Sequence, residues 1–465
     1  MKLYLILLSL ILIFSLSHCD RCVFGRGNTE MSVTCDLVGS KPVHVIKDKS
    51  VSCGPTETLT ENINSISVRN CDFDEISLFE NLTTLLLRRS HDMPITLRKE
   101  TFVGMNNLEK FIVKNAKVNV LPSVFSDLPN IELVAFDNNN NLKLSESAFH
   151  GAYKLKLLYM SSLYLKSASI SSLPDGFFRD LNNLEWLEIN KCDLADLNAI
   201  DFTGLESVKW LGLSENDISI VTGNAFHIMT NLKYLTLKRN KISDVGSMLF
   251  SKLQNLVHLN LEYNRIEQLK TTTFSGLTNL RSINLRNNRI QRIEDGTFSN
   301  LNYLKKLDLS YNNLTALTEH SFNGLTNLRY LAVHHNLISS INVNAFTALT
   351  KLIQLDLSNQ QGQLAVDLNA FPQFVDLTTK TVIYTPIPQP DDFEKRELQW
   401  LENLPIGDDT NKIYSDFFGN FTLKRHQDEL DVNDLSQAIR YQWIILGNLN
   451  LANIEITSVN VEKRL

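Results

Sequence analysis

The stretch that decides the fold reads Leu256-Val-His-Leu259-Asn-Leu261-Glu-Tyr-Asn264-Arg-Ile266, the clearest copy of the phrase L-x-x-L-x-L-x-x-N-x-L. The phrase begins every 24 residues, eight times without slippage, at Leu184, Val208, Leu232, Leu256, Leu280, Leu304, Leu328 and Leu352. A fixed period of this length means that one structural unit repeats, and each unit buries its apolar face only against its neighbours. The sequence therefore predicts a solenoid. Because a solenoid presents a long surface, recognition is favoured over chemistry.

Each copy carries the alternation of a β-strand. In the copy that begins at Leu304, Leu307 and Leu309 should point inward, while the outward positions are Lys306, Asp308 and Ser310. Successive strands pair in parallel, which requires a long return segment between them. That segment has its own apolar anchors, above all a phenylalanine that recurs at Phe202, Phe226, Phe250, Phe274, Phe298, Phe322 and Phe346. We expect a parallel sheet on the concave side and a buried aromatic spine on the convex side.

An asparagine recurs where each strand turns away, at Asn216, Asn240, Asn264, Asn288, Asn312 and Asn336. An amide both donates and accepts hydrogen bonds, so it can satisfy turn backbone groups that would otherwise be buried unpaired. Cys192 takes this place in its own repeat, and we expect a buried structural thiol there, not a reactive one. In the last copy Gln360 stands in the asparagine position, and the phrase weakens.

Looser copies of the phrase extend the array upstream, so that it spans residues 63–372 and has about a dozen strands. At roughly 4.8 Å per strand, its sheet would be about 60 Å long. An insertion at residues 165–170 should bulge from a loop.

The unit LxxLxLxxNxLxxLxxxxFxxL resembles the extracellular typical class of leucine-rich repeat proteins over roughly residues 60–372. The resemblance implies an α/β leucine-rich repeat solenoid, a horseshoe with a parallel concave sheet, a disulfide-bonded N-terminal cap and a small C-terminal extension. The family includes receptors, adhesion, matrix and immune proteins, so the fold alone does not define the function. Many relatives close the array with a cysteine cluster, whereas here no cysteine follows Cys192. The unusual C-terminal end resembles secreted leucine-rich immune proteins of insects, although their long coiled coil is not evident.

The chain opens with a predicted signal peptide, residues 1–19: a lysine, an apolar run from Leu3 to Leu16, and a polar exit. No later apolar run is long enough to span a bilayer, and no hydrophobic tail suggests a lipid anchor. We therefore expect a secreted, extracellular protein without membrane insertion.

Cysteines predict an N-terminal cap over residues 20–62, which would cover the edge of the first strand. Cys22, Cys35, Cys53 and Cys71 lie before or within the first repeat. Four cysteines allow three connectivities, and we favour Cys22–Cys35 with Cys53–Cys71, because residues 31–35 read as a strand.

A proline-rich break at residues 385–390 cannot continue the strand ladder. Residues 373–404 are expected to form a C-terminal cap with a short helix from Asp391 to Leu404. Residues 405–465 form an extension to which no module is assigned.

Three sequons predict N-linked glycans, at Asn81, Asn313 and Asn420. Asn313 follows the inward Asn312, so its side chain should point outward.

An aromatic stripe crosses the outward strand positions of four consecutive repeats, with one more aromatic further along: Trp186, Trp210, Tyr234, His258 and Tyr330. Aromatic side chains with polar groups are typical of binding surfaces. The alternative is lateral packing between strands without a ligand.

A second stripe is basic and comprises Lys238, Arg239, Lys241, Arg265, Arg286, Arg289 and Arg292. Because the net charge of the chain is −6, this basic character is local and could meet an anionic glycan or an acidic protein patch. Interleaved glutamates at positions 215, 262, 267 and 294 favour a solvated, mixed face instead.

Motifs for catalysis, metals and cofactors do not stand out. His334 and His335 are adjacent, but His258 lies three repeats away, about 15 Å at strand spacing, which is too far to share a metal. The acidic balance and the expected compartment argue against nucleic acid.

The sequence therefore predicts a secreted, non-enzymatic recognition protein that binds a protein or a surface glycan through its concave face. A role in innate immunity is the more specific version of this prediction. A structural or adhesive role in the extracellular matrix is the alternative, and homo- and hetero-oligomers both stay open.

Overall fold

The computed structural model describes residues 82–361, apart from residues 89–93, 138, 140, 162–172, 174, 220, 222, 224, 247, 248 and 358. Outside this range it describes the backbone of six short strands. The predicted signal peptide, Cys53, Cys71, Asn81, Asn420, the insertion at 165–170 and the helix at 391–404 lie outside the described residues. The chain divides into unit 1 (Met1–Leu194 and Ala199–Trp210) and unit 2 (Ala195–Asn198 and Leu211–Leu465).

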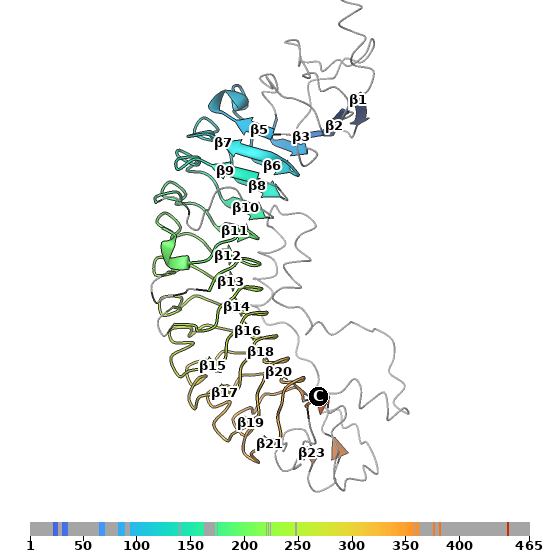
Figure 1. The fold of residues 1–465 in the computed structure, drawn as a ribbon, viewed down its shortest axis with the longest axis vertical. Coiled ribbons are helices and arrows are strands. Elements are labelled where there is room, and N and C mark those ends of the chain that lie inside the picture. Colours follow the sequence, from blue (N-terminus) through green and yellow to red (C-terminus); the bar gives the residue numbers. More distant parts are fainter. Residues whose placement is uncertain are drawn as a thin grey trace, which may run out of the picture. The chain divides into compact units, whose positions relative to one another are not determined.

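Unit 1 is built on a sheet whose neighbouring strands follow the chain order (Figure 1). An antiparallel hairpin of β1 and β2 opens it, and the following strands add in parallel. The strands are β1 (Cys22–Arg26), β2 (Glu30–Cys35), β3 (Ser65–Arg69), β4 (Thr84–Arg88), β6 (Lys110–Lys114), β8 (Leu133–Asp137), β10 (Leu157–Ser161) and β11 (Trp186–Asn190). Return segments contribute β5 (Pro94–Leu97), β7 (Lys117–Val120), β9 (Asn141–Leu144) and the 3-10 helix η1 (Lys99–Phe102).

Unit 2 continues the same construction with shorter strands, and its strands also add in parallel (Figure 1). They are β13 (Tyr234–Thr236), β14 (His258–Asn260), β16 (Ser282–Asn284), β18 (Lys306–Asp308), β20 (Tyr330–Ala332), β22 (Gln354–Asp356) and β25 (Ile444–Ile445). Smaller pairs are β15 (Gln268–Leu269) with β17 (Arg292–Ile293), β19 (Ala316–Leu317) with β21 (Ser340–Ile341), and β23 (Val375–Asp376) with β24 (Thr381–Val382). The strand β12 (Trp210–Gly212) and the 3-10 helix η2 (Leu197–Ala199) each contain residues of both units.

The strand register is the one that the repeat predicts. Ile283 pairs with Leu307, and Leu307 pairs with Leu331, so each residue meets its equivalent in the next repeat. Leu307 and Leu309 are fully buried. The phenylalanine spine is also buried, and some of its rings stack in pairs, as Phe274 and Phe298 do at 5.8 Å between centroids. The predicted solenoid, register and apolar core are confirmed.

Buried asparagines tie each repeat to the one before it. The Asn264 Oδ1 accepts from the backbone N–H of Ile242 at 3.1 Å, while its Nδ2 donates to the carbonyls of Leu237 and Leu261 at 2.9 and 3.0 Å. Asn240, Asn288, Asn312 and Asn336 make equivalent bonds. Gln360 reproduces the pattern with its longer amide, accepting from the Ile338 N–H at 3.1 Å. Gln360 in place of asparagine therefore preserves the hydrogen bonds of this position, although it departs from the repeat phrase.

The residue just before each of these amides adopts a left-handed backbone, a feature that the sequence does not reveal. Tyr263 has a φ of 56°, which is uncommon for a bulky residue. In this conformation its N–H donates to the carbonyl of Arg286 in the next repeat at 2.9 Å. The inter-repeat bonding thus selects a conformation that these side chains do not favour by themselves.

The cysteine predictions fall partly within the described residues. Cys192 forms no disulfide within the described residues and is fully buried in the asparagine position, as expected. In the N-terminal hairpin, Cys22 and Cys35 are direct backbone partners. The disulfide between them stays a prediction.

Candidate functional site

A row of polar side chains lies on the strand-bearing face of unit 2, where each member follows the second inward residue of its repeat. We call it the polar row; its described members, spaced 24 residues apart, are Ser214, Lys238, Glu262, Arg286, Ser310 and His334. The parallel register brings equivalent positions side by side, so these six side chains can contact one another in sequence.

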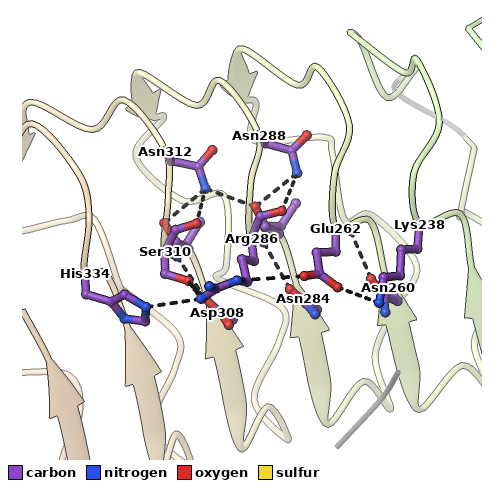
Figure 2. Close-up of polar contacts among 12 residues, drawn as sticks. Lys238, Asn260, Glu262, Asn284, Arg286, Asn288, Asp308, Ser310, Asn312 and His334 are labelled. Carbon is purple, nitrogen blue, oxygen red and sulfur yellow. Dashed lines mark hydrogen bonds and ion pairs between the residues drawn. The ribbon is translucent and has the colours of Figure 1, made fainter. Parts of the chain in front are cut away.

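Charges alternate along the first part of the polar row (Figure 2). The Lys238 Nζ lies 3.1 Å from the Glu262 Oε2, and the Arg286 Nε lies 3.8 Å from the Glu262 Oε1. Only 20% of the Lys238 side chain and 11% of the Glu262 side chain are exposed, so water screens this pair less than an open surface pair. Glu262 therefore joins two cations of neighbouring repeats.

Arg286 is the centre of the second part of the row (Figure 2). Its Nη1 donates to the Ser310 Oγ at 2.9 Å and contacts the His334 Nε2 at 3.2 Å. The guanidinium carbon also lies 4.1 Å from the ring centroid of Tyr311, in cation–π geometry. These contacts hold the arginine in one orientation without satisfying all five of its N–H groups.

The contact with Arg286 defines the proton position on His334. A guanidinium can only donate, so the Nε2 of a neutral His334 must accept and the proton must sit on Nδ1. The Nδ1 lies 3.2 Å from the Asp356 Oδ2 but makes no hydrogen bond to it, so the attraction between this carboxylate and the proton is electrostatic only. Arg286 thus donates a hydrogen bond to one ring nitrogen, whereas the negative charge of Asp356 lies beside the other.

Asp308 and Ser310, both predicted to point outward, are nevertheless buried. The Asp308 Oδ1 accepts from the backbone N–H of Ser310 at 2.9 Å and from its hydroxyl at 2.5 Å. Burial raises the pKa of the Asp308 carboxyl, against the opposing effect of the bonds from Ser310. The Asp308 carboxyl group therefore fixes both the backbone and the hydroxyl of Ser310, a member of the polar row.

The predicted aromatic stripe forms stacked pairs that are buried. In unit 1, Trp186 and Trp210 stack at 4.0 Å between ring centroids and are 1% and 2% exposed. In unit 2, Tyr234 and His258 stack at 4.9 Å, and Tyr330 is 9% exposed. Burial lowers the pKa of His258 to about 3, with smaller effects from the charges of neighbouring cations. Stacking and burial favour the packing interpretation, and a ligand contact at these residues stays a prediction.

The sequence pattern indicated Lys238 and Arg286 as candidates for binding, but Glu262 was interpreted only as an acid that makes the basic face mixed in charge. Ser310 and His334 were not recognised as members of the same network. The signal that would have found them is their common spacing, because the position after the second inward residue is polar in six consecutive repeats.

No chemistry beyond binding is evident in the described residues. They contain no cluster of three or more side chains suited to holding a metal ion. They also contain no helix long and apolar enough to cross a membrane. The predicted glycan acceptor Asn313 is exposed, as expected for its position.

Two family descriptions match this sequence. The one described as Leucine rich repeat matches residues 159–218, 213–266, 230–290, 254–314, 278–338 and 302–361, and the one described as BspA type Leucine rich repeat region (6 copies) matches residues 55–168. With the parallel-strand solenoid, these matches show that the chain belongs to the leucine-rich repeat family. Comparison with curated protein sequences finds no match.

Similar solved structures are leucine-rich repeat chains found in complexes. A chain in the Drosophila Toll–Spatzle complex (glycosylated form) is 15% identical, with a TM-score of 0.55, and the match covers 78% of this chain and 57% of that one. A chain in the mouse RP105/MD-1 complex is 18% identical, with a TM-score of 0.46 and coverage of 75% and 72%. The present chain thus spans little more than half of the Toll-complex chain. Likeness at this level of identity shows the fold alone.

Proposed function

We propose that this protein is secreted and recognises a protein or a surface glycan through the strand-bearing face of its repeat array, which the sequence predicts to be concave. The observation that carries the proposal is the polar row. Its charged and hydroxyl side chains are lined up just after the ends of neighbouring strands and held by mutual contacts, so a partner would meet donors and acceptors that are already ordered. Such preorganisation lowers the entropy cost of binding.

The partner we favour is a protein. The row offers cations, an anion, a hydroxyl and an imidazole within adjacent repeats, which is the mixed polarity of a protein–protein interface. In the Toll–Spatzle complex a chain of the same fold is found with a protein, and a comparable role in innate immunity is part of this proposal. Transcript induction after microbial challenge would support that role, and its absence would count against it.

The test is cross-linked capture of partners by the secreted protein, with variants of the polar row. Lys238→Ala combined with His334→Ala should reduce capture of the main partner at least ten-fold. Lys156→Ala with Lys209→Ala is the control, because these lysines also pair with glutamates but lie in unit 1. Thermal unfolding of each variant separates lost recognition from lost folding. Equal capture by both doubles would refute binding at the polar row.

A structural or adhesive role in the extracellular matrix is the second candidate. It is favoured by the repeating architecture itself, which could serve as a spacer. Self-association would then be expected, and light scattering on the purified protein decides the matter: a strict monomer at micromolar concentration contradicts the matrix role.

A further inference from the structure

Basic side chains of unit 2 differ in whether an acid neutralises them. Lys238 and Arg286 share Glu262 within the polar row. The Lys241 Nζ lies 2.9 Å from the Asp217 Oδ1. Each of these three cations has an acidic neighbour, although two of them share one glutamate, so their attraction for a distant anion is weakened.

Three arginines in the same repeats are not compensated. Arg239, Arg265 and Arg289 are exposed, and none of them forms an ion pair with a carboxylate of the described residues. The Arg239 guanidinium lies 4.7 Å from the ring centroid of Tyr263, whose side chain is 41% exposed. Glu267 is exposed nearby in sequence but pairs with none of them. We call Arg239, Tyr263, Arg265 and Arg289 the arginine edge.

Backbone bonds hold the arginine edge at the spacing of the repeats. The N–H of Arg265 donates to the carbonyl of Ile242 at 2.8 Å, and the N–H of Arg289 donates to that of Ile266 at 2.9 Å. Arg265 and Arg289 therefore occupy equivalent positions in adjacent repeats, about 5 Å apart at strand spacing.

Like charges that lie side by side on adjacent repeats repel each other, whereas opposite charges attract. The polar row follows this rule in these very repeats, since Glu262 separates Lys238 from Arg286. The arginine edge violates the rule with Arg265 beside Arg289. An anionic ligand spanning both side chains would relieve this repulsion.

We propose that the arginine edge binds a linear acidic polysaccharide that carries sulfate or carboxylate groups. A polymer with a charge on successive sugar units can meet Arg265 and Arg289, which occupy equivalent positions in successive repeats, while Arg239 lies two positions earlier in the preceding repeat. Guanidinium groups bind sulfate and carboxylate through paired hydrogen bonds, and the exposed ring of Tyr263 offers an apolar face to a sugar. This site lies on the loops that follow the strands and does not depend on the partner of the polar row.

The test measures the affinity of the full secreted protein for a heparin oligosaccharide at about 0.15 M salt, where exposed charges are strongly screened. Arg265→Gln with Arg289→Gln should weaken binding at least ten-fold and lower the slope of log affinity against log salt by about one per arginine. Arg289→Gln alone should give a smaller loss of the same kind. Lys156→Gln with Lys209→Gln is the control: it removes the same net charge from compensated pairs and should change affinity less than two-fold.

Three outcomes would overturn the proposal. The first is no binding of heparin by the wild-type protein. The second is an equal loss in the arginine and lysine doubles, which would mean attraction by net charge only. The third is competition by poly-L-glutamate of matched charge as effective as that by heparin, which would assign the edge to an acidic protein surface. Partner capture by the polar row should be unchanged in the arginine variants, so the two proposals fail separately.

Discussion

Arg286 and His334 lie two repeats apart, yet the Arg286 Nη1 contacts the His334 Nε2 at 3.2 Å, passing beside Ser310. Because the arginine can only donate, this contact selects the neutral tautomer of His334 with its proton on Nδ1. A free histidine side chain does not favour the Nδ1-protonated tautomer by itself. The tautomer of His334 therefore reports whether its contact with Arg286 is formed.

The first prediction concerns this tautomer. Long-range nitrogen–proton correlation spectra of histidine-labelled protein at neutral pH should show His334 protonated on Nδ1. Arg286→Leu removes the donor, and the signal should move toward the Nε2-protonated form, while His258 keeps its own pattern. An Nε2-protonated His334 in the wild-type protein would contradict the contact.

The second prediction concerns pH and His258, whose pKa is lowered to about 3 in the folded protein from 6.5. Between these values the unfolded chain takes up a proton that the folded chain does not, so stability should fall as the pH falls from about 6.5 toward 3. His258→Phe keeps a ring beside Tyr234 and removes the titration. Between pH 7 and pH 5, urea unfolding of the wild type should lose about 2 kcal/mol more than that of the variant. Parallel pH dependence of the two proteins would be the contrary result.

The third prediction concerns the buried asparagines. Asn288→Ala leaves the N–H of Ile266 and the carbonyls of Leu261 and Leu285 without their amide partner. Unpaired buried polar groups are costly, so the free energy of unfolding should fall by about 3 kcal/mol. Asn279→Ala is the matched control, because this exposed amide makes one bond to the preceding repeat, and its loss should stay below about 1 kcal/mol. Chemical unfolding measures the free energy of unfolding of both variants. Equal losses would contradict the conclusion that the buried amides stabilise the array more than the exposed ones.

The fourth prediction concerns the strand register. Leu307→Asp buries a carboxylate among apolar neighbours and should cost several kcal/mol or prevent folding. Lys306→Gln, one residue away on the opposite face, loses a contact at 5.6 Å from the Tyr330 ring and should cost about 0.5 kcal/mol. A comparable cost for both changes would place the strand in another register.

The fifth prediction concerns the cysteines. Cys192 is fully buried, so the native protein should show almost no thiol that reacts with an alkylating agent. After unfolding without reductant, one thiol should react if the predicted disulfides form and residues 1–19 are removed. The backbone pairing of Cys22 with Cys35 supports their disulfide, whose loss should cost roughly 2–5 kcal/mol. Mass spectrometry of a non-reduced digest tests the pairing, and a disulfide that contains Cys192 would contradict it.

The fold was predictable from the sequence because one signal is repeated with a constant period. The inward positions of Leu307 and Leu309 and the phenylalanine spine follow from that period and from the burial of apolar groups. The left-handed backbone of Tyr263 was not predictable, because the propensity of a tyrosine points elsewhere and inter-repeat bonds override it.

The candidate site was only partly predictable for a related reason. Alternation gives the side of the sheet on which Arg286 lies, but it does not say how far a long side chain reaches along that side. The contact with His334 depends on a side-chain orientation that Ser310 and Tyr311 select together. Likewise, Asp308 was predicted to point outward, and its burial depends on contacts that the repeat period does not describe.

The bonds of the buried amides have a genetic consequence. Each amide makes the same three hydrogen bonds, two to the preceding repeat and one within its own, and Gln360 makes them with a longer side chain. The amide bonds at the described junctions from Asn240 to Gln360 are therefore chemically interchangeable. A recombination event that inserts or deletes one whole 24-residue segment between equivalent points leaves only junctions of the existing kind. The gene can thus lengthen or shorten the repeat array one repeat at a time while keeping the same bonds between neighbouring repeats.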